Sequence, residues 1–203
     1  METAFFDVDT QLDFVYPAGA LYTPGAESIA KPLGRLTHFA SVHHIQVIST
    51  TDAHAEDDPE FAVWKPHCVT GTAGQQKLAG TLLKDPLVLT TAPDALKAVQ
   101  PRIRAASQII IQKQKIDCFT NPNLEPLLSS LETERFVVYG LLTEFCVHSA
   151  VFGLLKLGFQ VEVVTDAIKS VDSDKGRAIL DRFQASGGRL TTVNEVTGLG
   201  AQR

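Results

Sequence analysis

Cys146 is the residue in this sequence whose position is best suited to covalent chemistry. It follows an apolar, β-branched and aromatic run at residues 135–139, and the residues after Gly140 carry apolar side chains at helical spacing. The thiol therefore lies where a buried strand gives way to a helix, near unpaired N–H groups and the positive end of the helix dipole. That position favours a thiolate, and the same N–H groups could hold an oxyanion during acyl transfer. The alternative is a buried and inert cysteine, and only the rest of the chain separates the two.

Other ionisable residues follow further strands of the same kind. Asp9 comes after the first apolar run and Lys113 after the third, while Asp52 and His54 follow the second. In a parallel sheet the carboxyl ends of the strands meet at one edge, which is where ligands bind. A carboxylate there can take the proton of Cys146, and an ammonium can lower the pKa of the thiol. The sequence therefore predicts a site that combines an acid, a cation and a thiol.

Two of these assignments have competitors with similar spacing. Lys115 would share a face with Lys113 if the third strand continued, so the period of a strand does not choose between them. Asp7 and Asp13 compete with Asp9 for the acidic role, and Asp13 could cap a turn instead. The residues alone leave both choices open.

A mixed set of carboxylate and imidazole side chains follows the second strand. Asp52 and His54 are two apart on an extended chain and so point to the same side, and His67 follows a loop that contains Glu60. Such a set suits one divalent metal ion, zinc first, with manganese or iron also compatible. Cys68 is not expected to join it, because adjacent side chains on an extended chain diverge. The alternative is that Asp52 caps a turn and that the histidines are ordinary polar residues.

Six strands and the helices between them must position these residues. The strands are predicted at residues 4–8, 44–49, 108–112, 135–139, 160–164 and 189–193. Helices are predicted at residues 24–43, 124–131, 146–158 and 173–186, the last with Ser173 as N-cap. A short helix or structured loop is expected at residues 72–83, and the end of another element at 95–100. The alternation predicts an α/β domain with a doubly wound, mostly parallel six-stranded sheet and helices on both faces.

Length and composition limit the kind of protein. The 203 residues, 44% of them hydrophobic, suffice for one sizeable core, so we expect a single domain over residues 1–203. A net charge of -5 argues against nucleic acid and membrane partners, and no apolar run approaches the length of a membrane span. The chain does not begin like a signal peptide, and its three cysteines suggest no disulfide framework. A cytoplasmic location is expected.

Five segments together resemble the isochorismatase-like cysteine hydrolases, and within them the nicotinamidase branch. They are DTQLDF (9–14), DAHAEDDPEF (52–61), WKPHCVTGT (64–72), QKQKIDCF (112–119) and GLLTEFCVHSA (140–150). They occur in family order over nearly the whole chain, and the second and third are the most discriminating. The resemblance implies the fold of this family and a homo-oligomer.

The resemblance also implies a catalytic set. It makes Asp9 the general base, Lys113 the second member of a triad and Cys146 the nucleophile. It implies a cis peptide bond between Leu141 and Leu142, with the N–H groups of Leu142 and Cys146 as the oxyanion hole. The implied activity is hydrolysis of a small amide, nicotinamide to nicotinate and ammonia, through a Cys146 thioester.

The remaining site residues follow from the same resemblance. The implied metal ligands are Asp52, His54 and His67, with Glu60 where some members have histidine. Phe14 and Trp64 would line the pocket for the substrate ring.

Several other functions stay open. The same triad could act on another small amide, on a carbamoyl or ureido compound, or on an isochorismate-like vinyl ether, although members of the last kind generally lack the metal motif. Leu141 and Leu142 replace the small residues usual before the threonine, and the segment after Lys113 is short. These departures bear on the substrate more than on the chemistry. The alternative that is not an enzyme is a non-catalytic module in which Cys146 serves as a thiol sensor.

Overall fold

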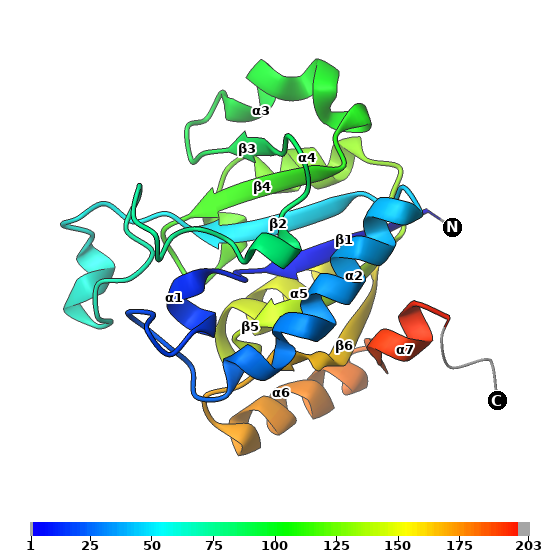
Figure 1. Cartoon of the computed structure of the whole chain (residues 1–203). Helices are drawn as coiled ribbons and strands as arrows, with labels where there is room; N and C mark the ends of the chain where they lie inside the picture. The colour runs from blue at the N-terminus through cyan, green and yellow to red at the C-terminus, as the bar shows by residue number, and fades with distance from the viewer. Residues whose placement is uncertain (1, 199–203) are drawn as a thin grey trace.

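A parallel sheet of seven strands forms the centre of the computed structural model, which describes residues 2–198 (Figure 1). The strands are β1 (Thr3–Val8), β2 (Val47–Asp52), β3 (Leu87–Leu89), β4 (Gln108–Lys113), β5 (Arg135–Leu141), β6 (Gln160–Lys169) and β7 (Arg189–Thr191). Their order is β3-β4-β2-β1-β5-β6-β7, and each of these pairings is parallel. The chain moves from β1 toward one edge and then returns to place β5 on the other side of β1. The predicted doubly wound α/β fold is confirmed.

The prediction of six strands is wrong, because the sheet also contains β3. This strand lies at an edge of the sheet, in a segment where the sequence pattern predicts no element. It has three residues, directly follows Pro86, and exposes 43% of Val88. So short an edge strand carries too brief an apolar pattern to identify.

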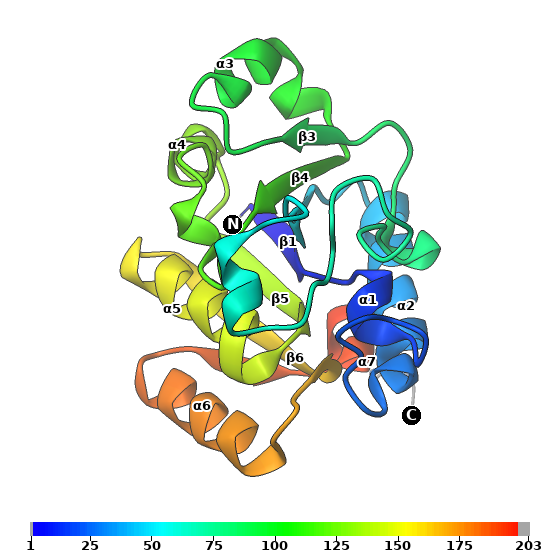
Figure 2. The same ribbon diagram turned by 90° about the vertical axis from the view of Figure 1, so that its left-hand side faces the viewer.

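Helices cover both faces of the sheet (Figure 2). One face carries α1 (Leu12–Val15), α2 (Ala30–Val42) and α7 (Val193–Val196), the other α4 (Leu124–Ser130), α5 (His148–Lys156) and α6 (Ser173–Ala185), while α3 (Ala95–Val99) contacts β3. The core against α5 includes Val138 and Leu154, and the core against α2 includes Phe5 and Leu33. Within residues 2–198, no helix combines the length and apolar character that crossing a bilayer requires.

Several boundaries differ from the predicted ones. A π-helical turn, Thr143–Val147, precedes α5, so the helical segment after β5 begins before Cys146. Residues 72–83 form a loop with one 3₁₀ turn, Ala79–Thr81. The N-cap of α6 is Asp172, whose carboxylate accepts the N–H groups two and three residues later, so Ser173 is the first helical residue. Residue 1 and residues 199–203 lie outside the described residues, and the single domain over 1–203 stays a prediction.

The register of the strands determines where the polar residues emerge. Val8 pairs with Thr50 of β2 on one side and with Gly140 of β5 on the other, and Asp52 pairs directly with Lys113 across β2 and β4. Gly140 has φ +119°, and a side chain there would collide with the Val8 carbonyl, so glycine is required. The carboxyl ends of β4, β2, β1 and β5 therefore lie next to one another, at the switch point of the sheet.

Candidate functional site

Lys113 is the centre of a polar cluster at this edge. Its side chain is fully buried, and Nζ lies 2.9 Å from Asp9 Oδ2 and 3.5 Å from Cys146 Sγ. The ammonium also forms a close ion pair with Asp52 Oδ1. Asp9 accepts a hydrogen bond from Thr50 Oγ1 at 2.7 Å. Distant segments of the chain thus bring a carboxylate, an ammonium and a thiol into contact.

The residues that compete with Asp9 and Lys113 in the sequence lie elsewhere. The side chain of Lys115 is 55% exposed, and its Nζ lies 3.8 Å from the carboxylate of Glu60. Asp7 forms a buried ion pair with Lys77 at 2.7 Å. Asp13 accepts two backbone N–H groups from neighbouring loops, at 2.8 and 2.7 Å, which is the turn-capping alternative. The geometry therefore separates Asp9 and Lys113 from these competitors.

Cys146 is held by the wide turn between β5 and α5. The Leu141–Leu142 peptide bond that leads into the turn is cis, as the resemblance implies. The N–H groups of Phe145 and Val147 both donate to the Leu142 carbonyl, at 3.0 and 3.1 Å. The turn leaves the sulfur half-buried and facing the polar cluster.

Burial and charge together decide where the protons lie. Burial raises the pKa of Cys146, and the carboxylates of Asp9 and Asp52 raise it further, which outweighs the opposing effect of Lys113. The thiolate expected at a helix start is therefore not the resting form, because burial disfavours it and two carboxylates face the one ammonium. Burial also raises the pKa of Asp9. Burial would lower the pKa of Lys113, but the two carboxylates outweigh it and keep the ammonium charged.

Asp52, His54 and His67 form a second group beside the first. One ligand atom of each lies within 4.8 Å of the others, and all three residues are buried. Asp52 Oδ2 is 4.0 Å from His54 Nε2 and 3.7 Å from His67 Nε2. Beyond the end of β2, His54 forms a parallel bridge with Val69, and this pairing brings His67 alongside. The fold therefore assembles the three residues that the sequence pattern relates.

The imidazole rings are oriented as metal ligands require. Asp58 Oδ2 lies 3.0 Å from His54 Nδ1, and the Lys65 carbonyl lies 2.7 Å from His67 Nδ1. With Nδ1 as the N–H donor, each Nε2 presents a lone pair. His54 Nε2 is buried and has no hydrogen-bond partner among the described residues, so the donor set fits a divalent ion. Glu60 is not part of the compact group, and its ligand role stays a prediction.

Aromatic rings pack against the two histidines. The Phe14 ring lies 5.4 Å from the imidazole of His67, and Phe61 lies 5.8 Å from the same imidazole. Trp64 packs edge to face against Phe145 at 5.4 Å. These side chains can bound a space for a flat, apolar substrate ring.

Three residues to which the sequence alone assigns no role also contact the site. The histidines are contacted by Asp58 and Phe61, and the backbone of Asp52 by Gln11. Asp58 follows His54 by four residues and directly precedes a proline, a spacing that could have identified it as the acceptor for the imidazole. Gln11 lies inside the DTQLDF segment, where the pattern marks a glutamine without showing its partners.

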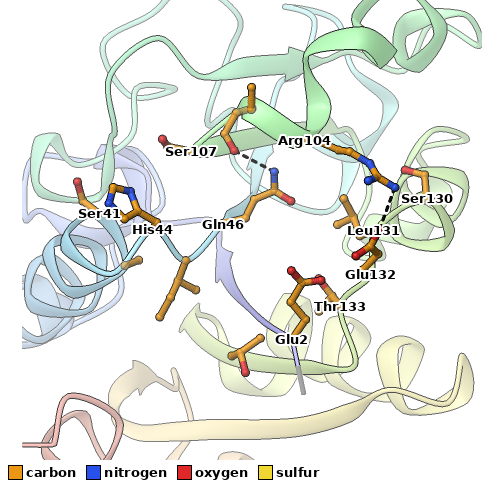
Figure 3. A pocket seen from close by; sticks show the side chains of 15 residues that line it. Glu2, Ser41, His44, Gln46, Arg104, Ser107, Ser130, Leu131, Glu132 and Thr133 are labelled. Atoms are coloured by element: carbon orange, nitrogen blue, oxygen red, sulfur yellow. Dashed lines mark hydrogen bonds and ion pairs between the residues drawn. The ribbon is translucent and has the colours of Figure 1, made fainter.

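A hollow of about 650 Å³ lies at the other end of the strands, where β1, β2, β4 and β5 begin (Figure 3). Two of its polar residues are engaged with neighbours: Arg104 pairs with Glu132 at 3.1 Å, and the Gln46 amide donates to two backbone carbonyls. Its lining includes neither a cysteine nor a group of metal ligands. The candidate site is therefore identified by its chemistry rather than by its volume.

Known proteins are similar to this chain in sequence and in fold. The family model for the isochorismatase domain matches residues 3–195. The nicotinamidase of Escherichia coli (strain K12) is 26% identical over 210 residues, which cover 92% of each chain. The pyrazinamidase of Pyrococcus horikoshii in complex with zinc has a TM-score of 0.79 at 23% identity, over 95% of this chain and 99% of that chain. The N-carbamoylsarcosine amidase from Thermoplasma acidophilum has a TM-score of 0.75 at 21% identity, over 96% of this chain and 98% of that chain. Because the family model spans nearly all of the described residues, the resemblance is confirmed and the chain belongs to the isochorismatase family.

Proposed function

We propose that this protein is a metal-containing cysteine amidohydrolase that converts nicotinamide to nicotinate and ammonia. The observation that carries the proposal is the contact of Lys113 with both Asp9 and Cys146, directly beside the group formed by Asp52 and two histidines. A carboxylate, an ammonium and a thiol in contact are suited to acyl transfer through a thioester. The names of similar proteins, nicotinamidase and pyrazinamidase, support an amide substrate.

Asp9 moves the proton in the first half of the reaction. It accepts the thiol proton of Cys146 while the sulfur attacks the amide carbon and the C–S bond forms. Because burial raises the pKa of Asp9, the protonated carboxyl can then give this proton to the departing nitrogen. The C–N bond breaks, ammonia leaves, and a thioester remains on Cys146. Lys113 stays charged throughout and offsets the negative charge that develops beside it.

Water completes the reaction on the same groups. Asp9 takes a proton from the water as its oxygen attacks the thioester carbon, the C–S bond breaks, and the sulfur regains a proton from Asp9. The second proton of the water leaves with the carboxylic acid and passes to ammonia in solution, so the final products are the carboxylate and ammonium, and the resting cluster is restored.

The backbone N–H groups of Leu142 and Cys146 are the proposed oxyanion donors. The neighbouring N–H groups of Phe145 and Val147 are already donated to the Leu142 carbonyl, so they do not compete for this role. Loss of one such donor costs about 3 kcal/mol of transition-state stabilisation in enzymes where it has been measured.

Asp52, His54 and His67 would hold the divalent ion, with Glu60 as a further proposed ligand. When bound, the ion supplies a Lewis-acid contact for the pyridine nitrogen, directly or through water, and so orients the ring. Phe14, which is 5% exposed, would flank that ring, and Trp64 would close the other side.

A hydrolase of another small amide, or of a carbamoyl or ureido compound, is the second candidate. The half-buried Leu142 precedes the turn that carries the nucleophile, at a position where family members usually have a small residue, and we propose that it narrows the space for a ring. The fold likeness to an N-carbamoylsarcosine amidase supports testing such a substrate.

Ammonia release by the zinc-loaded protein tests the proposal. Nicotinamide should yield ammonia and nicotinate in equal amounts, and Cys146→Ala should yield neither. Benzamide, which lacks the ring nitrogen, should be a poorer substrate. If nicotinamide yields no ammonia, the substrate assignment is wrong, and turnover of N-carbamoylsarcosine instead would favour the second candidate.

A further inference from the structure

The side chain of Gln11 continues the sheet where the backbone of β1 ends. The last β1–β2 pair is Val8 with Thr50, and one further backbone bond joins Asp9 N–H to the Thr50 carbonyl. Asp9 then has φ +47°, which turns the chain away from β2. Two residues later the Gln11 amide returns to β2: its Oε1 accepts the Asp52 N–H at 2.7 Å, and its Nε2 donates to the Asp52 carbonyl at 2.8 Å.

These contacts use the amide fully. Gln11 Nε2 makes a further hydrogen bond, to the Gln75 carbonyl at 2.8 Å, and the residue is entirely buried. The same side chain therefore fixes the segment with Asp9, the backbone of Asp52 and the loop that follows His67. Because Asp52 contacts both Lys113 and the histidines, its position affects both groups of the site.

We propose that Gln11 is a positioning residue that holds Asp52 in register with Asp9. Without its amide, the end of β2 is free to shift relative to the segment with Asp9, and the ligand set loses its geometry. The inference rests on the proposed function in so far as the Asp52 group binds a metal ion, and it does not depend on which amide is hydrolysed.

Gln108 provides a matched control. It is also entirely buried, and its amide also makes three hydrogen bonds, donating to Ser49 Oγ and the Thr81 carbonyl at 2.9 Å and accepting the Leu83 N–H at 2.8 Å. It lies at the start of β4, the end of the strand away from the site. Gln108→Met therefore removes the same number of buried hydrogen bonds as Gln11→Met without touching Asp52.

Zinc affinity, measured by competition with a chromophoric chelator, distinguishes positioning from a general loss of stability. Gln11→Met should weaken zinc binding about 10- to 100-fold, the range seen when groups that support metal ligands are removed, while Gln108→Met should leave it within about twofold. Thermal unfolding temperatures of the two variants should fall by similar amounts. The shorter amides of Gln11→Asn and Gln108→Asn give a second matched pair with the same expected order of affinities.

The inference would be overturned if Gln11→Met bound zinc as tightly as Gln108→Met and Gln11→Asn as tightly as Gln108→Asn. A wild-type protein that does not bind zinc would overturn it as well. A wild-type protein that binds zinc but releases no ammonia would refute the amidase proposal alone, because the zinc comparison still decides the role of Gln11.

Discussion

Replacing Lys113 by methionine is the most informative perturbation of this site. At 2.9 Å and an effective dielectric constant of about 20, the attraction between Lys113 and Asp9 is about 6 kcal/mol before desolvation is subtracted. Removing the cation leaves the buried Asp9 carboxylate without its counter-charge, and leaves Asp52 with only the two histidines as partners of opposite polarity. Breaking a buried pair in this way costs about 3–5 kcal/mol of stability, or about 6–20 °C in the unfolding temperature of a chain of this length. Turnover should fall much further, by about 1,000-fold or more, because Lys113 also faces the sulfur.

Lys77→Met separates the chemical effect of Lys113 from its structural one. Lys77 is likewise buried and paired with one carboxylate, that of Asp7, at 2.7 Å, but it does not contact Cys146. Calorimetry should show comparable destabilisation of the two variants, while kcat should fall at least about 100-fold more in Lys113→Met. Lys113 lowers the pKa of Asp9, so Lys113→Met should raise it. Asp9 must be ionised to accept a proton, and the residual activity of the variant should therefore be lost at a higher pH than the activity of the wild-type protein when the solution is acidified. Equal losses of kcat in both variants would refute the catalytic role of Lys113.

Three further predictions test other parts of the site. Asp9→Asn should abolish turnover yet lower the pKa of Cys146, because the carboxylate that raises it is gone. Iodoacetamide labelling against pH measures this shift, and an unchanged profile would contradict the proposed electrostatics. Asp58→Asn should weaken zinc binding about 10- to 100-fold, because the His54 ring loses its charged acceptor. Unchanged affinity in a chelator competition would leave Asp58 with only the hydrogen bond that its carboxylate accepts from the Glu60 N–H. Leu142→Ala should raise kcat/KM for ring-substituted nicotinamides about tenfold relative to nicotinamide. An unchanged ratio would place Leu142 outside the pocket.

The location of the site can be predicted from the sequence because parallel strands end at a common edge. Asp9, Asp52 and Lys113 each follow a recognisable apolar run, so the fold class alone places them near one another. The choice between Lys113 and Lys115 cannot be made in this way, since both would share one face if the strand continued, whereas β4 ends at Lys113. The structure decides it through register, because Lys113 pairs with Asp52 across β2 and β4.

Features that depend on several segments at once are not visible in the sequence. The predicted position of Cys146 at the start of a helix favours a thiolate, but the pKa of the thiol depends on the burial and on the sum of charges that only the folded chain brings together. The side chain of Gln11 looks like one more polar residue until its partners on β2 are known. The edge strand β3 owes its place to pairing with β4 rather than to its own three residues.

Asp52 links the two halves of the site through a single carboxylate. One oxygen pairs with Lys113, and the other faces His54 and His67 at 4.0 and 3.7 Å. Burial would raise the pKa of Asp52, but Lys113 and the histidines outweigh it, so the carboxylate stays charged. A metal ion bound to that second oxygen would draw negative charge away from Lys113 and leave more of its field for Asp9 and Cys146. Metal occupancy and thiol acidity are therefore expected to be coupled, and a substitution at Asp52 should change both together.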